Sequence, residues 1–492
     1  MGYEIDTREF TQQDYQRFQD RLLDQLEELR ALLASHSFGQ GPGSIGAELE
    51  LSITDQQGRA LAINQDIQSR VNDPLLALEL NRFNLEYNLT PVAAAGMPFS
   101  ALETEICAVL GMLNDAAAEQ GGKVVPIGIL PTLKRSDFGV KAMTNQSRYH
   151  VLTRELRRLR GRMFAVRING PEPISLRAQD VSLEGANTSL QLHYRVTPQR
   201  FADLFNAMQL VTPLLLAVGS NSPFLLGHRL WHETRVPLFK QAIDGRPRNA
   251  RDQQLPSRVD FGTGWVRRGA YELFAETVHL HPPLIPLCRD VPSNNGEAPE
   301  LFELRLHQGT VWPWNRAIYD PADGGHIRIE MRALPSGPSP CDMVANAALA
   351  IGLAEALSDD IEQLIPGLPF ATMDFNFYRA AECGIGAQLL WPDPDGHPRL
   401  TPRPVKEIVQ GLLPRAAQGL QQIGVDQQEI SFYLDIISKR LELSATGARW
   451  QMRQVKRLSQ RQKRHRALST MLHHYMRNVA ENQPVANWGE LR

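Results

Sequence analysis

The sequence predicts an α+β protein with a helical C-terminal section. Two observations support this fold class. Several short segments alternate strictly between polar and apolar residues, as half-buried strands do, and longer segments repeat apolar residues at helical spacing. No long linker or internal repeat divides the 492 residues. We therefore assign residues 1–365 to one domain that includes an N-terminal helix, and residues 366–492 to a mostly helical section packed on it.

Charge and cysteine content exclude several classes of protein. The formal net charge is -2, so no overall field attracts nucleic acid or membrane. The N-terminal segment lacks the apolar core of a secretory signal, and apolar runs such as 214–218 are too short to span a bilayer. We expect a cytoplasmic protein with no membrane partner. Its four cysteines are far apart, without a CxxC pair, and are predicted to be reduced structural thiols: Cys107, Cys288, Cys341 and Cys383.

The first element is an amphipathic helix over residues 8–34. Apolar residues recur there at helical spacing, and Thr11 with Asp14 resembles a capping box. This helix packs either on its own domain or on a second subunit, so the oligomeric state stays open. The glycine-rich segment 38–44 is not a phosphate-binding loop, because it lacks Gly-Lys-Ser/Thr and precedes a strand instead of a helix. We interpret it as a flexible entry to that strand.

The strand 46–51 places Glu48 and Glu50 on one face. Strand residues two positions apart are separated by about 7 Å, so the carboxylates repel each other unless a cation lies between them. Divalent cations with oxygen ligands suit this position. The alternative interpretation is an exposed polar face on a half-solvated strand.

The next polar strand covers residues 84–89, with Asn84, Glu86 and Asn88 on one side. Glu79 precedes it, and the alternative for Glu79 is that it merely starts a strand. A helix over 99–120 ends at two glycines and leads to a buried strand over 124–130, and a basic helix over 150–163 has the pattern of a solvated face.

The middle of the chain contains another alternating strand, 190–196, with Gln191, His193 and Arg195 on one face. A structural histidine is the alternative role for His193. A helix from Pro198 to about residue 218 follows and is broken by Asn221-Ser222-Pro223. Loops such as 231–265 are expected to determine specificity, but the sequence does not give their conformation.

Two further segments alternate, 301–307 and 327–332, and both are predicted strands. Between them, Trp312 and Trp314 flank a proline, and they either pack in the core or stack on an adenine or amine substrate. The remaining segments are predicted helices over 341–364, 404–420, 427–443 and 447–480.

The polar faces of these strands favour a cleft over open solvent. Lysine is absent from all of the polar strands, while Glu, His and Arg dominate. Such an oxygen-rich set suits two or more Mg²⁺ or Mn²⁺ ions. The predicted metal ligands are Glu48, Glu50, Glu79, Glu86, His193 and Glu330.

Arginine side chains complete the predicted site. The planar fork of Arg235, Arg316 and Arg332 suits phosphate and carboxylate groups. Carboxylates for metal ions, arginines and no phosphate-binding loop together indicate nucleotide phosphate chemistry on a sheet. The alternative for Arg235 is a surface residue in a loop.

At these residues the chain resembles the glutamate–cysteine ligase family, within the carboxylate–amine ligases that share the glutamine synthetase-like fold. Each motif is short, but their order makes the set fairly specific and covers most of residues 44–357. The resemblance implies a curved antiparallel sheet forming a funnel, with ATP and metals at one end and amino-acid substrates at the other. The matching pieces are Gly46-Ala47-Glu48-Leu49-Glu50, the Glu79/Glu86 pair, the His193 strand, Asn221-Ser222-Pro223 and Ile329-Glu330-Met331-Arg332.

The resemblance also implies a reaction and roles. A carboxylate takes the γ-phosphate of ATP, and an amine then attacks the acyl phosphate to form an amide. The six predicted ligands would hold Mg²⁺ or Mn²⁺, Glu50 and Glu330 would be essential to ATP turnover, and Arg332 would face the transferring phosphate. Arg235 and Arg316 are candidates for holding the substrate carboxylate. Nothing in the sequence identifies a cysteine pocket, so both substrates stay open.

Two rival functions remain. One is a phosphagen-type kinase on the same fold, which stops at phosphoryl transfer. The other is a non-catalytic nucleotide- or metal-binding adaptor that docks partners through the basic stretch 443–480. That stretch contains no acidic residue; it is either a solvated face, a cover over the ATP phosphates, or a docking surface for an acidic partner. It lacks interleaved aromatic residues for base stacking, so nucleic acid is not the favoured partner.

Overall fold

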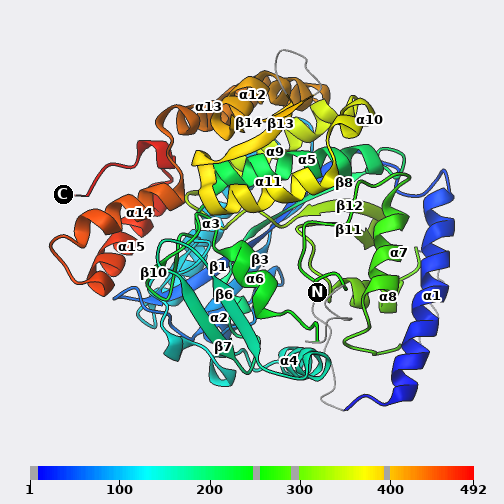
Figure 1. The fold of residues 1–492 in the computed structure, drawn as a ribbon, viewed down its shortest axis with the longest axis horizontal. Helices are drawn as coiled ribbons and strands as arrows, with labels where there is room; N and C mark the ends of the chain where they lie inside the picture. The colour runs from blue at the N-terminus through cyan, green and yellow to red at the C-terminus, as the bar shows by residue number, and fades with distance from the viewer. Residues whose placement is uncertain (1–8, 248–254, 290–297, 393–398, 492) are drawn as a thin grey trace.

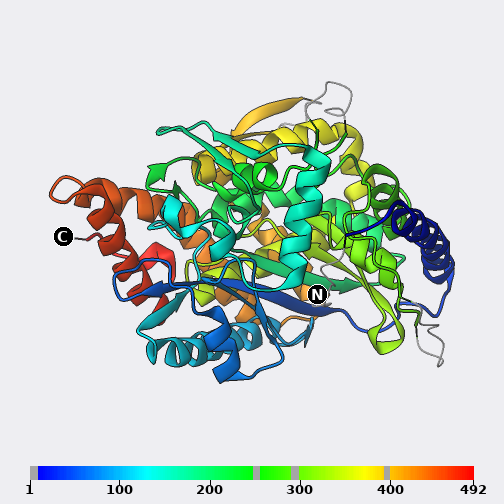
Figure 2. The same cartoon turned by 90° about the horizontal axis from the view of Figure 1, so that it is seen from below.

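The computed structural model describes residues 9–247, 255–289, 298–392 and 399–491. Residue 8, where the first helix was predicted to begin, and part of the predicted loop 231–265 lie outside these ranges. Within them, a curled antiparallel sheet is packed against helices (Figures 1 and 2). The predicted α+β class is confirmed.

Strand β1 lies at the centre of the sheet. It pairs antiparallel with β3 on one side and β8 on the other, and β4 and β5 pair with its two ends. The main path runs β11-β12-β8-β1-β3-β2. The strands are β1 (Ser44–Asp55), β2 (Leu76–Leu78), β3 (Asn84–Asn88), β4 (Val92–Ala93), β5 (Gly122–Val125), β8 (Leu190–Val196), β11 (Asn315–Asp320) and β12 (His326–Met331).

Two apolar helices, α5 (Phe201–Gly219) and α9 (Pro340–Ser358), belong to the buried core. Both are long and apolar enough to cross a membrane, but 89% and 100% of their apolar windows are buried, which is typical of core helices. Alternation along β8 separates the two faces of the sheet: the Tyr194 hydroxyl donates to Glu355 of α9 over 2.6 Å, while the neighbouring His193 points to the opposite face.

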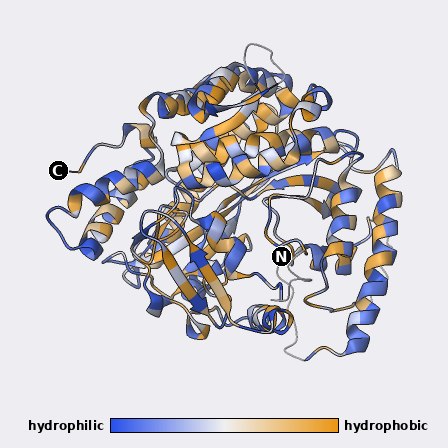
Figure 3. Cartoon of the chain, in the orientation of Figure 1, coloured by the Kyte–Doolittle hydropathy of each residue, from blue (hydrophilic) through white to orange (hydrophobic). Residues whose placement is uncertain are grey.

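The opposite face of the sheet is lined by α4 (Ser147–Arg160), α6 (Arg235–Ala242), α7 (Ala270–Leu280) and α8 (Phe302–Gln308). Helix α1 (Gln12–Ala34) packs on α7 and α8, and hydrophilic and hydrophobic residues alternate along it in Figure 3. Its capping box is confirmed, with Thr11 and Asp14 bonding reciprocally.

Residues 366–492 form mostly helices, together with one β-hairpin, within the described ranges. The predicted helix 447–480 is two helices, because no apolar residue between Leu458 and Ala467 is available to bury. The remaining elements are α2 (Asn64–Val71), α3 (Pro98–Ala118), α10 (Ile361–Leu364), α11 (Phe370–Cys383), α12 (Val405–Gln422), α13 (Gln427–Leu443), α14 (Gly447–Leu458) and α15 (Arg464–Ala480), with the hairpins β6 (Phe164–Ile168) with β7 (Ile174–Ala178), β9 (Phe224–Leu225) with β10 (His228–Arg229), and β13 (Gln388–Pro392) with β14 (Leu400–Pro404).

Two predicted strands were wrong in whole or in part. Segment 301–307 is helix α8, and its polar positions Glu303 and His307 are buried with the apolar ones. A helix buried nearly all round gives no clean helical period, so its alternation was misleading. The predicted strand 124–130 ends at Val125, because Pro126 has no N–H to donate to the ladder.

Candidate functional site

A cavity of about 590 Å³ lies over the polar face of the sheet. Its floor is formed by acidic and basic side chains of β1, β3, β11 and β12 together with Gln191 of β8, and helices α4, α6, α7 and α8 form its walls. None of the described residues that line it comes from α14 or α15. The basic C-terminal stretch therefore does not cover this cavity; α14 and α15 lie at the edge of the molecule near the C-terminus (Figure 1).

Strand register brings the predicted metal ligands together. Glu50 lies opposite Glu86 across β1 and β3, and Glu330 lies opposite His193 across β12 and β8. Glu48 shares the cavity face with Glu50, because alternate residues of a strand point the same way. The sheet therefore gathers carboxylates that are far apart in the sequence.

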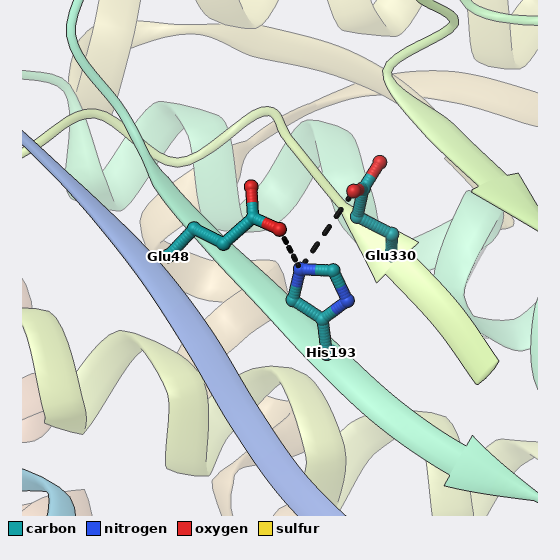
Figure 4. A group of neighbouring side chains, drawn as sticks. All are labelled: Glu48, His193 and Glu330. Carbon is teal, nitrogen blue, oxygen red and sulfur yellow. Dashed lines mark ion pairs between the residues drawn. The ribbon is translucent and has the colours of Figure 1, made fainter. Parts of the chain in front are cut away.

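Three of the predicted ligands converge: Glu48, His193 and Glu330 (Figure 4). The His193 Nε2 atom lies 3.2 Å from Glu48 Oε1 and 3.7 Å from Glu330 Oε1. One ligand atom from each residue lies within 4.8 Å of the others. This spacing suits a divalent cation bound by oxygen and imidazole ligands.

The imidazole itself fits a metal ligand. His193 Nε2 is buried and makes no hydrogen bond of good geometry within the described residues, although Glu48 Oε1 lies 3.2 Å from it. Arg328 Nε donates to His193 Nδ1 over 2.9 Å and holds the ring. His193 would hold a metal ion through Nε2 only with the ring proton on Nδ1, which would require the Arg328 guanidinium to release that atom.

Glu330 is the most firmly held carboxylate of the site. Arg316 Nη2 donates to its Oε1 over 3.0 Å, the Nε of the same guanidinium contacts Oε2, and Arg332 Nη1 lies 3.2 Å from Oε2. Burial raises the pKa of Glu330, but the charges of Arg316, Arg332 and His193 outweigh burial and hold the pKa well below its usual range. Glu330 is therefore ionised.

A second acidic group lines the same cavity. It contains the predicted ligands Glu50, Glu79 and Glu86, together with Glu184 from the short 3-10 helix η3 (Glu184–Ala186). Burial and the charge of Glu79 raise the pKa of Glu50 to about 7. Burial and neighbouring carboxylates also raise the pKa values of Glu86 and Glu184 well above their usual range. Such crowding of like charges is relieved by divalent cations.

Glu50 and Arg332 are linked through Gln191. The Ser189 N–H and Gln191 Nε2 donate to Glu50 over 2.7 and 2.8 Å, and Arg332 Nη1 donates to Gln191 Oε1. Burial lowers the pKa of Arg332, but the charges of Glu330, Glu50 and Glu48 outweigh burial and raise the pKa above its usual value, so the guanidinium stays charged. A fixed positive charge between the two acidic groups is well placed for an anionic group.

The two arginines predicted to hold the substrate carboxylate lie in different places. Arg316 lines the cavity, but most of its N–H groups are already used by Glu330 and by the carbonyls of Gln308 and Val311. The structure does not bring Arg235 to the cavity: it is 2% exposed and donates to Glu233 over 2.7 Å and to the Ala333 carbonyl. It is not a surface loop residue either, because it begins α6.

The two tryptophans also separate. Trp314 is 2% exposed and packs on Phe239 and Phe377, with ring centroids 5.8 and 5.5 Å apart. Trp312 is partly exposed and lines the cavity. The sequence analysis missed Glu184 and the apolar wall around Trp312. Glu184 follows no periodic pattern, so only its position in the fold identifies it.

The raised carboxyl pKa values predict how stability depends on pH in the metal-free protein. Unfolded chains release these protons near pH 4.5, whereas the folded protein keeps the Glu50 proton until about pH 7. The folded state binds more protons in this window, so its stability falls as pH rises, by about 3 kcal/mol from Glu50 alone. Urea unfolding in EDTA at about pH 5 and about pH 8 measures this, and Mg²⁺ is expected to reduce the loss. Constant or rising stability in EDTA contradicts the prediction.

Comparison with known proteins gives three findings. The family model described as glutamate–cysteine ligase family 2 matches residues 44–474. A Frankia alni protein, provisionally named glutamate–cysteine ligase 2-1, is 23% identical over 383 residues, which cover 76% of this chain and 82% of that protein. The crystal structure of a Francisella tularensis glutamate–cysteine ligase in complex with AMP is 11% identical and has a TM-score of 0.52, and the match covers 90% of each chain. This structural likeness concerns the fold.

Proposed function

Because the chain belongs to glutamate–cysteine ligase family 2, we propose that it joins a carboxylate to an amine at the expense of ATP, through an acyl-phosphate intermediate. The observation that carries this proposal is the charge arrangement of the cavity. Two acidic groups, Glu48 with His193 and Glu330, and Glu50 with Glu79 and Glu86, flank the buried guanidinium of Arg332. These acids suit divalent cations, and Arg332 suits a phosphoryl group.

The reaction has two balanced steps. A carboxylate oxygen of the first substrate attacks the γ-phosphorus of ATP, and ADP leaves. The amine nitrogen then attacks the acyl carbon, inorganic phosphate leaves, and the nitrogen loses a proton as the amide forms. Arg332, oriented by Glu330 and Gln191, would donate to the transferring phosphoryl group in the first step. Mg²⁺ or Mn²⁺ on the six predicted ligands would neutralise phosphate charge.

The family also suggests which substrates the enzyme uses. We propose γ-glutamyl ligation to an amine, with cysteine as one candidate acceptor. Arg316 is retained as the candidate for the substrate carboxylate, through the one N–H that its contacts within the described residues leave unused. We also propose a cytoplasmic location, since all four cysteines are free thiols.

Phosphate release from ATP and Mg²⁺ tests the proposal. Glutamate is supplied with and without a panel of amines that includes cysteine. We expect release to depend on both glutamate and one amine, with an amide as product. A stable phosphorylated product without amine would indicate a kinase. Neither phosphate release with any carboxylate nor a thermal shift with ATP and Mg²⁺ would contradict the proposal and favour the adaptor.

A further inference from the structure

One part of the cavity combines a carboxylate with an apolar wall. The carboxylate is Glu184 on η3, which lines the same cavity as Glu50 and Glu79 and lies close enough to interact with their charges. The wall is formed by Phe239 on α6, Ile243 just after it, and Trp312. Helix α6 packs against η3, and the residues of the wall line the same cavity as Glu184.

Hydrogen bonds from two arginines hold the segment of the wall that carries Trp312. Arg316 Nη1 donates to the carbonyls of Gln308 and Val311, each over 3.4 Å, and Arg258 Nη1 donates to the carbonyl of Thr310 over 3.1 Å. The Trp312 N–H donates in turn to the Arg258 carbonyl over 2.6 Å. Two buried arginines thus fix the segment 308–312, and its Trp312 side chain is a preorganised cavity surface.

The side chains of Phe239, Ile243 and Trp312 form an apolar corner of the cavity. The centroids of Phe239 and Trp312 are 6.4 Å apart with the ring planes tilted by 56°. Phe239 is 7% exposed and Trp312 more so, which leaves apolar surface open to the cavity. A polar substituent placed there would lose its hydration without gaining a partner. An alkyl or aromatic group would gain burial.

We propose that this corner binds the amine substrate of the ligase, and that this amine carries an alkyl or aromatic group. Its ammonium faces Glu184, and its apolar group lies against Phe239, Ile243 and Trp312. The inference rests on the proposed ligase function and deepens it. The Glu184 carboxyl lies near the carboxylates of Glu79 and Glu50, so an ammonium placed beside it would stabilise its ionised form, and the wall selects the substituent.

Calorimetric titration of the full chain with Mg²⁺ and a series of n-alkylamines, from ethylamine to hexylamine, tests this. We expect each added methylene to lower Kd by about fourfold in the wild type. Trp312→Ala should flatten the series, while Glu184→Gln should weaken every amine by about tenfold and leave the slope unchanged. The matched controls are Trp391→Ala on β13 and Glu407→Gln on the exposed face of α12, which should match the wild type.

Two results would overturn the inference. One is a Kd that does not depend on alkyl length. The other is a Trp312→Ala variant that loses ATP affinity and keeps the amine series, which would assign the corner to adenine. Failure of the ligase function appears separately, as an absence of phosphate release with every carboxylate and amine. A length-independent Kd with active phosphate release contradicts only the inference about the amine.

Discussion

Glu330→Gln is expected to lower ATP turnover by about 10³-fold or more while the chain still folds. Glu330 has three roles in the proposed site. It offers one of the three converging ligand atoms, it accepts hydrogen bonds from Arg316, and it orients Arg332. The amide keeps the shape of the side chain but removes the charge that a cation and both guanidinium groups need. ATP turnover is measured as ADP formation, and circular dichroism reports the fold.

A matched control exists on the opposite face of the sheet. Glu355 is also a buried carboxylate in an ion pair, 2.8 Å from Arg200 and 2.6 Å from the Tyr194 hydroxyl. Glu355→Gln removes a comparable buried charge without touching the cavity, so it should lower stability and leave ATP turnover near the wild-type value. Equal activity in Glu330→Gln and Glu355→Gln would remove the cavity from consideration as the ATP site.

The residues of the acidic floor could be identified from the sequence because alternation along a strand shows which residues share a face. Alternation around Glu48, Glu86, His193 and Glu330 fixes their side of the sheet, and antiparallel pairing then brings them together. Residues outside regular strands carry no such signal. Glu184 lies in a single 3-10 turn, and its approach to the acidic row depends on where the whole sheet places that turn.

Burial on all sides was the main source of error. Helix α8 was predicted as a strand from its alternating sequence, but most of its polar residues are buried along with its apolar ones. Arg235 was predicted to hold the substrate carboxylate, but its guanidinium forms a buried ion pair with Glu233. Buried polar residues are satisfied by partners distant in sequence, such as the Ala333 carbonyl that accepts from Arg235. A local pattern does not reveal such partners, so charge at a position does not by itself indicate a ligand.

Asp342→Ala is expected to lower the free energy of unfolding by about 3–5 kcal/mol, because it leaves the guanidinium of Arg440 buried without its counter-ion. The pair joins α9 to α13 at 2.7 Å, with side chains 0% and 1% exposed. Asp342 also accepts from Ser339 Oγ over 2.7 Å and from the Val485 N–H over 2.8 Å, so one side chain ties the core helix to two parts of the C-terminal section.

Urea unfolding followed by tryptophan fluorescence measures this loss. Asp435→Ala is the matched control on α13, since its ion pair with Lys439 has the same 2.7 Å separation but is 56% exposed on both sides. It should cost less than about 1 kcal/mol, because water already solvates both charges. Comparable small losses in both variants would mean that the buried pair contributes no more than a surface contact. A large loss for Asp342→Ala in one cooperative transition instead implies that the C-terminal helices and the sheet with its cavity unfold as one unit, since the pair lies where α9 meets them both.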